Sequence, residues 1–221
     1  DLLRDAMDAW QNNLSHELLD HYRFLQARWG LDSKPLTELM KAMLMEQQSV
    51  RMRSEAQLLE YCHGVAGTIG LMLCPIFGVK EKKALEHADN LGIAMQLTNI
   101  CRDVFEDAEN DRIYLPADLF SSALTTANLK SEDSYSREAC NAAKERLLQM
   151  ADELYTCSDA GIDYLPFRIR IVVRWASRMY REIGNVIRTE PKRFHENRAV
   201  VGQTKKMFFL IKCITRSLYK K

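Results

Sequence analysis

The sequence is poor in the two residues that most often interrupt helices, with nine glycines and five prolines among 221 residues. Leu, Ala, Met, Glu, Lys and Arg are common instead, and these residues favour helices. No segment alternates apolar and polar residues over a useful length, so a strand-rich fold is excluded. We therefore expect helical secondary structure throughout.

Long apolar runs and paired cysteines are also missing. Without a run of about 18 apolar residues, no transmembrane segment is predicted. The six cysteines form no CxxC pair, which excludes the usual spacings of zinc sites and disulfide frameworks. We expect buried free thiols in a reducing compartment, and a cytoplasmic protein.

The net charge of +1 conceals an uneven distribution. From residue 188 to residue 221 there are ten Lys and Arg against two Glu, a net charge of +8, which leaves −7 for the rest. This segment carries no base-reading pattern, so we expect no nucleic-acid partner. Its last helix is amphipathic and basic, which suits peripheral contact with the inner face of an anionic membrane. The alternative is a core helix with a solvated basic edge.

Apolar residues recur with a period near 3.6 along most of the chain, and they predict one all-α domain over residues 1–221. Ser54 and Gln57 form a capping box for one of these helices. A polar, Ser/Thr-rich connection precedes residue 137. The seven or eight expected helices cover 1–28, 33–44, 54–73, 80–109, 117–121, 137–160, 166–189 and 203–218.

A stripe of polar residues interrupts the longest predicted helix. Its members are spaced by three, four and four residues, which places them on one helical face: Gln96, Asn99, Asp103 and Asp107. Apolar residues occupy another face, so we expect the stripe to point into a cavity. Two carboxylates one turn apart are best neutralised by a hard cation such as Mg²⁺, and the Asn99 amide can add an oxygen ligand. By spacing alone, the pattern is more typical of a solvated helix surface than of a metal site.

Two longer strings around this stripe resemble the signatures of one family. The string QLTNICRDVFED at residues 96–107, followed by DRIYLP at 111–116, resembles the second aspartate-rich motif of squalene and phytoene synthases. The string YCHGVAGTIG at residues 61–70 resembles that family's other signature. The IYLP ending is more similar to phytoene and dehydrosqualene synthases than to eukaryotic squalene synthases.

The resemblance implies an isoprenoid-synthase-type helical bundle with a central cavity. It implies a Mg²⁺-dependent transferase that condenses two allylic prenyl diphosphates head to head, either farnesyl or geranylgeranyl diphosphate. The reaction would pass through a cyclopropyl intermediate to a C30 or C40 product such as phytoene, squalene or dehydrosqualene. NADPH would be needed only for squalene.

The resemblance also assigns roles to individual residues. Asn99, Asp103 and Asp107 would hold the metal, and Tyr61, Asp103 and Asp107 would be catalytic. The substrate would be bound by Gln96, Asn99, Arg102, Arg112 and Tyr180. A buried structural tyrosine remains the alternative for Tyr61, and the wall of the pocket would come from Met43, Phe105 or Leu71, unless these serve only as core.

The sequence departs from the family pattern in one major respect, because nothing in it matches the first aspartate-rich motif. The chain starts at Asp1 and aligns with the C-terminal three-quarters of the family, so we expect that N-terminal helices precede it. The alternative is a non-catalytic relative that serves in assembly or scaffolding, although such relatives generally lose their aspartates. A smaller departure is Glu46, which stands where many relatives have Asp; it is either a metal or water ligand or a surface acid.

Overall fold

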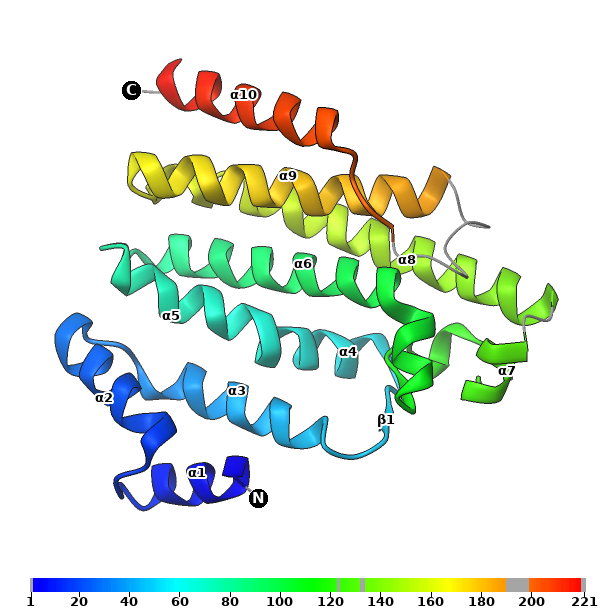
Figure 1. Ribbon diagram of the computed structural model, residues 1–221, viewed down its shortest axis with the longest axis horizontal. Helices are drawn as coiled ribbons and strands as arrows, with labels where there is room; N and C mark the ends of the chain where they lie inside the picture. The colour runs from blue at the N-terminus through cyan, green and yellow to red at the C-terminus, as the bar shows by residue number, and fades with distance from the viewer. Residues whose placement is uncertain (1, 123, 132–133, 190–198, 220–221) are drawn as a thin grey trace.

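A computed structural model describes residues 2–122, 124–131, 134–189 and 199–219. Over these residues the chain forms ten α-helices and two very short strands. In Figure 1 the helices form successive layers, from α10 through α9 and α6 to α4 and α5, then α3, with α1 and α2 at the far side. The helices are α1 (Leu2–Gln11), α2 (Glu17–Trp29), α3 (Ser33–Met45), α4 (Glu55–Cys62), α5 (Thr68–Ile76), α6 (Lys82–Glu109), α7 (Thr126–Ser131), α8 (Ser134–Ser158), α9 (Phe167–Thr189) and α10 (Gln203–Tyr219).

The first predicted helix, over residues 1–28, is in fact two helices. The chain turns between α1 and α2, where Asn13 adopts a left-handed conformation with φ of 53°, which asparagine tolerates better than most residues. His16 then caps α2, its ring Nδ1 accepting a hydrogen bond from the backbone of Leu18 (3.3 Å). The apolar period continues across this break, so periodicity alone could not reveal it.

A continuous helical segment runs from Glu55 to Ile76. Ser54 caps it as expected, accepting from the backbone N–H of Gln57 at 3.2 Å. A π-helical turn, His63–Gly67, separates α4 from α5. By length and composition alone this segment is apolar enough to span a membrane, but the core helix of a folded domain meets the same criterion. Here it packs between α3 and α6.

The centre of the bundle is α6, which packs against α5 on one side and against α8 and α9 on the other. Its fully buried residues include Ala94, Leu97 and Ile100. Small residues let the π-helical turn and α5 approach α6 closely, since a Cβ on Gly92 would lie 2.5 Å from the carbonyl oxygen of Ala66 and one on Gly70 would lie 2.6 Å from that of Ala88. The expectation of an all-helical bundle is confirmed.

Two regions differ from the predicted pattern near the end of α6. Strands β1 (Val50–Arg51) and β2 (Arg112–Ile113) form a parallel pair that joins the end of α3 to the end of α6. At two residues each, they are too short for an alternation signal. The short helix expected at 117–121 is a 3₁₀ turn, Ala117–Leu119, and α7 lies within the segment expected to be an irregular connection.

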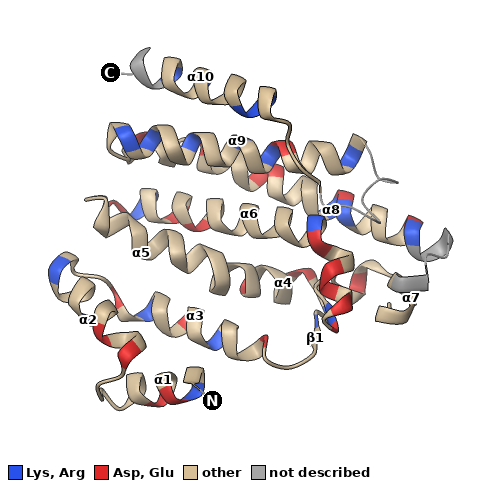
Figure 2. Ribbon diagram, viewed as in Figure 1, with Lys and Arg blue, Asp and Glu red and all other residues tan. Residues whose placement is uncertain are grey.

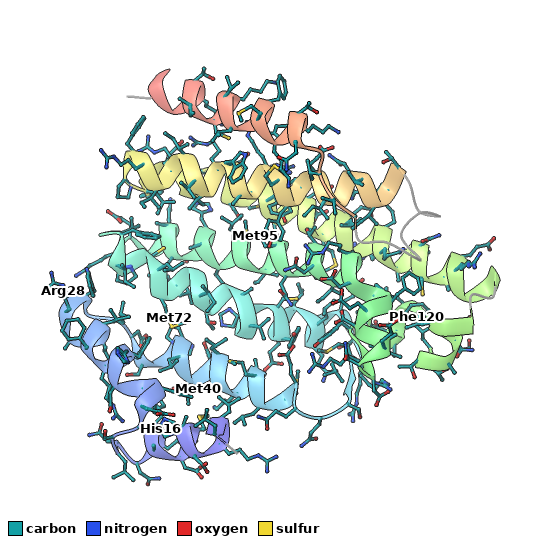
Figure 3. The ribbon with its side chains drawn as sticks, in the orientation of Figure 1. His16, Arg28, Met40, Met72, Met95 and Phe120 are labelled. Carbon is teal, nitrogen blue, oxygen red and sulfur yellow. The ribbon has the colours of Figure 1, made fainter. Side chains whose placement is uncertain are left out.

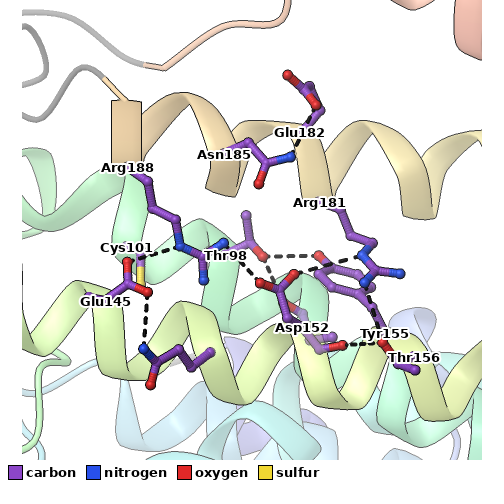
Figure 4. Close-up of polar contacts among 12 residues, drawn as sticks. Thr98, Cys101, Glu145, Asp152, Tyr155, Thr156, Arg181, Glu182, Asn185 and Arg188 are labelled. Carbon is purple, nitrogen blue, oxygen red and sulfur yellow. Dashed lines mark hydrogen bonds and ion pairs between the residues drawn. The ribbon is translucent and has the colours of Figure 1, made fainter.

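Charged side chains tie α8 to α9 (Figure 4). Arg188 reaches Glu145 at 2.9 Å and Asp152 at 2.8 Å. Nearby, the buried Tyr155 hydroxyl lies 2.9 Å from the Thr98 hydroxyl on α6. These bonds hold the α8–α9 layer against the central helix. Five cysteines are buried and free, as expected, and Cys157 is exposed.

Helix α10 packs on α9 and ends the described chain. Trp175 donates its indole N–H to the backbone carbonyl of Lys206 at 3.0 Å, and Lys205 pairs with Glu182. The outer face is apolar and exposed at Met207, Phe208 and Ile211. Several basic residues of the predicted tail, at 192, 193, 198, 220 and 221, lie outside the described residues.

Candidate active site

One face of α6 combines two kinds of surface. Towards its N-terminus the face is apolar and lines a cavity; towards its C-terminus the same face carries the polar stripe of Gln96, Asn99, Asp103 and Asp107. Positions separated by three or four residues share a helical face, and the cavity residues Met95 and Leu91 lie one and two turns before Asn99. Figure 2 shows acidic residues gathered where α6 approaches β1.

The cavity has a volume of about 250 Å³. Helices α5, α6 and α9 supply its wall, through residues such as Ile69, Leu73, Met95 and Ala176; Met95 is labelled on α6 in Figure 3. Almost every lining group is apolar, as a hydrocarbon chain requires. The central cavity predicted from the family resemblance is therefore present between these helices.

The cavity wall differs from the one proposed from sequence. Met43 is exposed, Phe105 packs against the main core beneath the Lys144 ammonium group, and Leu71 faces a different hollow near Gly30. None of the three lines the cavity. Their apolar character identified them as candidates, but helix rotation decides which surface each one faces.

The stripe is shielded from bulk solvent along much of its length. The Asp103 side chain is only 13% exposed and forms two hydrogen bonds with its neighbour Arg102, at 2.8 and 2.7 Å. The Asn99 amide donates to the Gln96 side chain at 3.4 Å, which leaves the buried Asn99 Oδ1 without a hydrogen-bond partner. A buried, unpaired acceptor of this kind is costly unless a ligand satisfies it.

Asp107, at the end of the stripe, lies where a negative charge is unfavourable. Burial and the nearby charge of Asp103 raise its pKa to about 7, although the Arg112 guanidinium acts in the opposite direction. Arg112 projects from β2 and donates to the backbone carbonyl of Glu46 at 3.4 Å. Strand pairing therefore brings this cation beside the carboxylates.

Glu46 occupies a more central position than the sequence indicated. It follows α3 directly, and one of its carboxylate oxygens accepts hydrogen bonds from two tyrosine hydroxyls, that of Tyr61 and that of Tyr114 (2.8 Å). The two rings stack, and both side chains are nearly fully buried. Burial and the Glu46 carboxylate raise the pKa of Tyr61 far above its ordinary value, so its hydroxyl remains protonated.

Arg112 links the tyrosine cluster to the stripe, because it donates to the Glu46 backbone and its charge acts on Asp107; the charge of Glu46 is a minor cause of the raised pKa of Asp107. The cluster therefore lies beside the end of the stripe. From the sequence, Glu46 had two possible roles and Tyr114 was not a candidate at all. The only signal for Glu46 was its position in the family pattern. Its proximity to Asp107 depends on the pairing of β1 with β2, which residue spacing does not reveal.

The stripe has the chemistry expected of a magnesium site that is completed by substrate. Asn99, Asp103 and Asp107 offer only oxygen ligands, and the orphaned Asn99 Oδ1 and the Asp107 carboxyl would both gain from a cation. Within the described part of the chain, no group of three or more His, Cys, Asp or Glu side chains is arranged to hold a metal ion. Mg²⁺ typically takes only one or two carboxylates and completes its shell with phosphate and water, so the residues fit it.

Tyr180 is the remaining predicted residue. It lies on α9 and packs against the main core. No contact described in the structure joins it to Asp103 or Asp107. Its assignment to substrate binding therefore stays a prediction.

Comparison with known proteins gives consistent similarities. A sequence profile described as Squalene/phytoene synthase matches residues 1–205. The 15-cis-phytoene synthase of Enterobacter agglomerans is 33% identical over 199 residues, covering 90% of this chain and 62% of the relative. Phytoene synthase 2, chloroplastic, of Solanum lycopersicum is 33% identical over 230 residues, covering 96% of this chain and 73% of the relative.

Among solved structures, a dehydrosqualene synthase in complex with ligand superposes with a TM-score of 0.77 at 23% identity, covering 98% of this chain and 78% of that chain. The squalene synthase HpnC from Alicyclobacillus acidocaldarius superposes with a TM-score of 0.68 at 20% identity, covering 88% and 73%. These likenesses establish the fold. The chain spans 62%, 50% and 40% of the length of three phytoene synthases that it matches.

Proposed function

Because the chain belongs to the squalene/phytoene synthase family, we propose that it provides a diphosphate-binding wall of an enzyme that condenses two prenyl diphosphates head to head. The observation that carries the proposal is the shared face of α6. An acidic, oxygen-rich stripe continues directly into an apolar cavity, and a prenyl diphosphate has the same two parts in the same order.

In this proposal Asn99, Asp103 and Asp107 hold Mg²⁺ against the substrate's diphosphate. When bound, the metal supplies Lewis-acid stabilisation of the departing diphosphate. Arg102 and Arg112 flank the stripe and offer guanidinium groups that can grip phosphate oxygens. Gln96 holds the Asn99 amide nitrogen, which directs the amide oxygen away from Gln96.

The cavity would receive the hydrocarbon tail. Its apolar lining excludes water, which protects an allylic cation from hydrolysis once the diphosphate has left. Tyr61 remains protonated and neutral, and its hydroxyl donates to Glu46, so this ring adds no negative charge beside the stripe. The charged stripe would therefore hold the departing diphosphate, while the apolar cavity holds the reacting carbons.

For the substrate, we propose geranylgeranyl diphosphate and a phytoene product, because the relatives with 33% identity are phytoene synthases. Farnesyl diphosphate and a C30 product are the alternative. A non-catalytic scaffolding role is less favoured, because Asp103 and Asp107 are both retained beside an intact cavity. NADPH would be required only if squalene were the product.

The proposal is tested by incubating the purified protein with Mg²⁺ and either geranylgeranyl or farnesyl diphosphate, and by identifying the hydrocarbon chromatographically. A second measurement isolates the contribution of this chain: calorimetric binding of pyrophosphate in the presence and absence of Mg²⁺. We expect Mg²⁺-dependent binding and a C40 product. Pyrophosphate binding that is weak and unaffected by Mg²⁺ would contradict the proposed role of the stripe.

The cavity can be tested separately with Ala176→Phe, which places a bulky ring against its wall. This variant should retain pyrophosphate binding but lose affinity for a prenyl diphosphate. Equal affinity of Ala176→Phe and the wild type for the prenyl diphosphate would show that the hydrocarbon tail lies elsewhere.

We also propose peripheral membrane contact, in the cytoplasm, through α10. The exposed Met207, Phe208 and Ile211 lie beside Lys205 and Lys212, a combination that suits an anionic lipid surface. Sedimentation with anionic vesicles, compared with zwitterionic ones, tests this. Replacing Phe208 and Ile211 with serine should abolish sedimentation, and persistence of binding would contradict the proposal.

A further inference from the structure

His63 lies between two carboxylates that belong to different helices. From the π-helical turn, its ring Nδ1 reaches Asp89 Oδ1 on α6 at 2.7 Å, and its Nε2 lies 3.3 Å from Glu38 Oε2 on α3. All three side chains are about 26–30% exposed, so water reaches the cluster without dispersing it. The histidine therefore connects three layers of the bundle.

The geometry specifies the protonation state of the ring. An ionised carboxylate only accepts hydrogen bonds, and a neutral imidazole can donate from just one of its nitrogens. Two carboxylate partners are both satisfied only when His63 carries a proton on each nitrogen. In the neutral ring, one of these contacts becomes a repulsion between lone pairs.

The surrounding backbone makes room for this arrangement. A Cβ on Gly67 would lie 1.9 Å from Asp89 Oδ1, so a larger residue there would displace the Asp89–His63 contact. A Cβ on Gly64 would lie 2.8 Å from the Cβ of Ala42, which shows how closely α3 approaches the turn. π-Helical turns are uncommon and occur frequently at functional sites.

We propose that doubly protonated His63 is a pH-dependent latch, which fixes the π-helical turn between α3 and α6 and so positions Tyr61 for the reaction. Tyr61 stands two residues before His63, at the end of α4, and its hydroxyl is bound to Glu46 beyond the end of α3. A shift of the turn relative to α3 would therefore alter the Tyr61–Glu46 contact. The catalytic consequence rests on the proposed function, whereas the latch itself does not.

Other charges facing His63 come from each neighbouring element. Helix α3 contributes Glu38 and Lys41, with Lys34 also 3.6 Å from Glu38. Helix α4 contributes Glu60, which lines the same hollow, and α6 contributes Asp89; α5 has no charged residue. Burial alone lowers the pKa of His63, but the hydrogen bonds and charges of Asp89 and Glu38 outweigh burial and raise it above 6.5.

The sign of the pH effect follows from this direction. A histidine whose pKa is raised on folding contributes stability that is fully present below the unfolded value of 6.5, and that is lost as the pH rises through the folded value. The latch should thus be closed below pH 6.5 and should open as the pH rises through the pKa of the folded state. Tyr61 would lose its fixed position on the alkaline side.

The experiment follows both ring resonances by NMR as the pH is varied. In the wild type, His63 should titrate above 6.5 and the Tyr61 ring signals should titrate with it. Asp89→Asn should lower the His63 pKa by about one unit or more, while the matched control Glu86→Gln, an exposed acid on the same helix, should not change it. His63→Arg, which donates to both carboxylates at all pH values, should abolish the titration of Tyr61.

Activity provides the second readout. The alkaline limb of the kcat/KM profile should move to lower pH in Asp89→Asn, stay in place in Glu86→Gln, and move to higher pH in His63→Arg. The latch proposal would be contradicted if the Tyr61 resonances did not change as His63 titrates. It would also be contradicted if His63 were neutral at pH 6. If the wild type forms no hydrocarbon, the proposed function fails, and the NMR titrations still decide whether the latch exists.

Discussion

Tyr61 and Tyr114 stack with their ring centroids 5.0 Å apart and point their hydroxyls at the same oxygen of Glu46. One tyrosine lies at the end of α4 and the other follows β2, so the pair joins two parts of the chain that meet only in the folded protein. A shared carboxylate orients both hydroxyls. The two tyrosines therefore form a matched pair for separating catalysis from structure.

Tyr61→Phe and Tyr114→Phe each remove one buried hydroxyl from Glu46. Both should lower the free energy of unfolding by about 1–2 kcal/mol, measured by denaturant titration. Only Tyr61→Phe should also reduce kcat/KM, on the order of 100-fold, if Tyr61 faces the reacting carbons. Equal losses of activity in the two variants would mean that the Glu46 cluster is structural.

Asp103→Asn removes a proposed metal ligand while keeping the shape of the side chain. We expect kcat/KM to fall by about 100-fold or more, because charge stabilisation of the leaving group is lost. The free energy of unfolding should change far less than the activity, because asparagine keeps the shape of the side chain and one oxygen that can still accept a hydrogen bond from Arg102. Glu106→Gln, an exposed acid on the same helix, serves as the control and should retain activity; normal turnover by Asp103→Asn would argue against the metal assignment.

Asp107 should make the metal-free protein less stable as the pH rises. Its pKa is about 7 in the folded protein and 3.8 for the ordinary carboxyl, so between these values the folded state holds a proton that the unfolded state has released. The free energy of unfolding should decrease by at most about 2 kcal/mol between pH 5.5 and 7. Asp107→Asn should remove this part of the pH dependence in thermal melts.

Bound Mg²⁺ should reverse the loss of stability at high pH, because a cation favours the ionised Asp107 carboxylate. The melting temperature of the wild type should rise more with Mg²⁺ at pH 8 than at pH 5.5. Asp107→Asn should show a smaller rise at pH 8. An identical response in both proteins would separate Asp107 from cation binding.

Gly92→Ala tests the close approach of the π-helical turn His63–Gly67 to α6. The new methyl group would lie 2.5 Å from the carbonyl oxygen of Ala66 and 2.8 Å from the Gly67 Cα, so the helices must separate. We expect a loss of about 1–3 kcal/mol in the free energy of unfolding. Gly202→Ala, where the added group meets open space, should be nearly neutral, and equal stabilities would show that the interface is able to adjust.

Local sequence patterns predicted the elements whose signals are local. The long period of α6 and the Ser54 cap were both recognised, because each depends on residues within a few positions of one another. The stripe from Gln96 to Asp107 was also identified by spacing. The sequence predicted one helix where the structure has α1 and α2. The left-handed conformation of Asn13 ends the helix there, but the apolar period continues past it.

The residues that line the cavity could not be predicted from the sequence. Met43, Phe105 and Leu71 were reasonable apolar candidates, whereas Leu91, Met95 and residues of α9 form the actual wall. Apolar character does not distinguish a residue that packs into the core from one that borders a hollow. Helix rotation and interhelical distance make that distinction.

The helical class of the chain, the limits of most helices and the row of oxygen-bearing side chains on one face of α6 all follow from local sequence. The folded structure was needed to show that Glu46 lies near Asp107, that two tyrosines meet on its carboxylate, and that His63 lies between Asp89 and Glu38. The reason is physical: helix periodicity depends on neighbours three or four positions apart, whereas these contacts join side chains separated by 15 to 68 positions. Packing of whole helices is needed to bring such residues together.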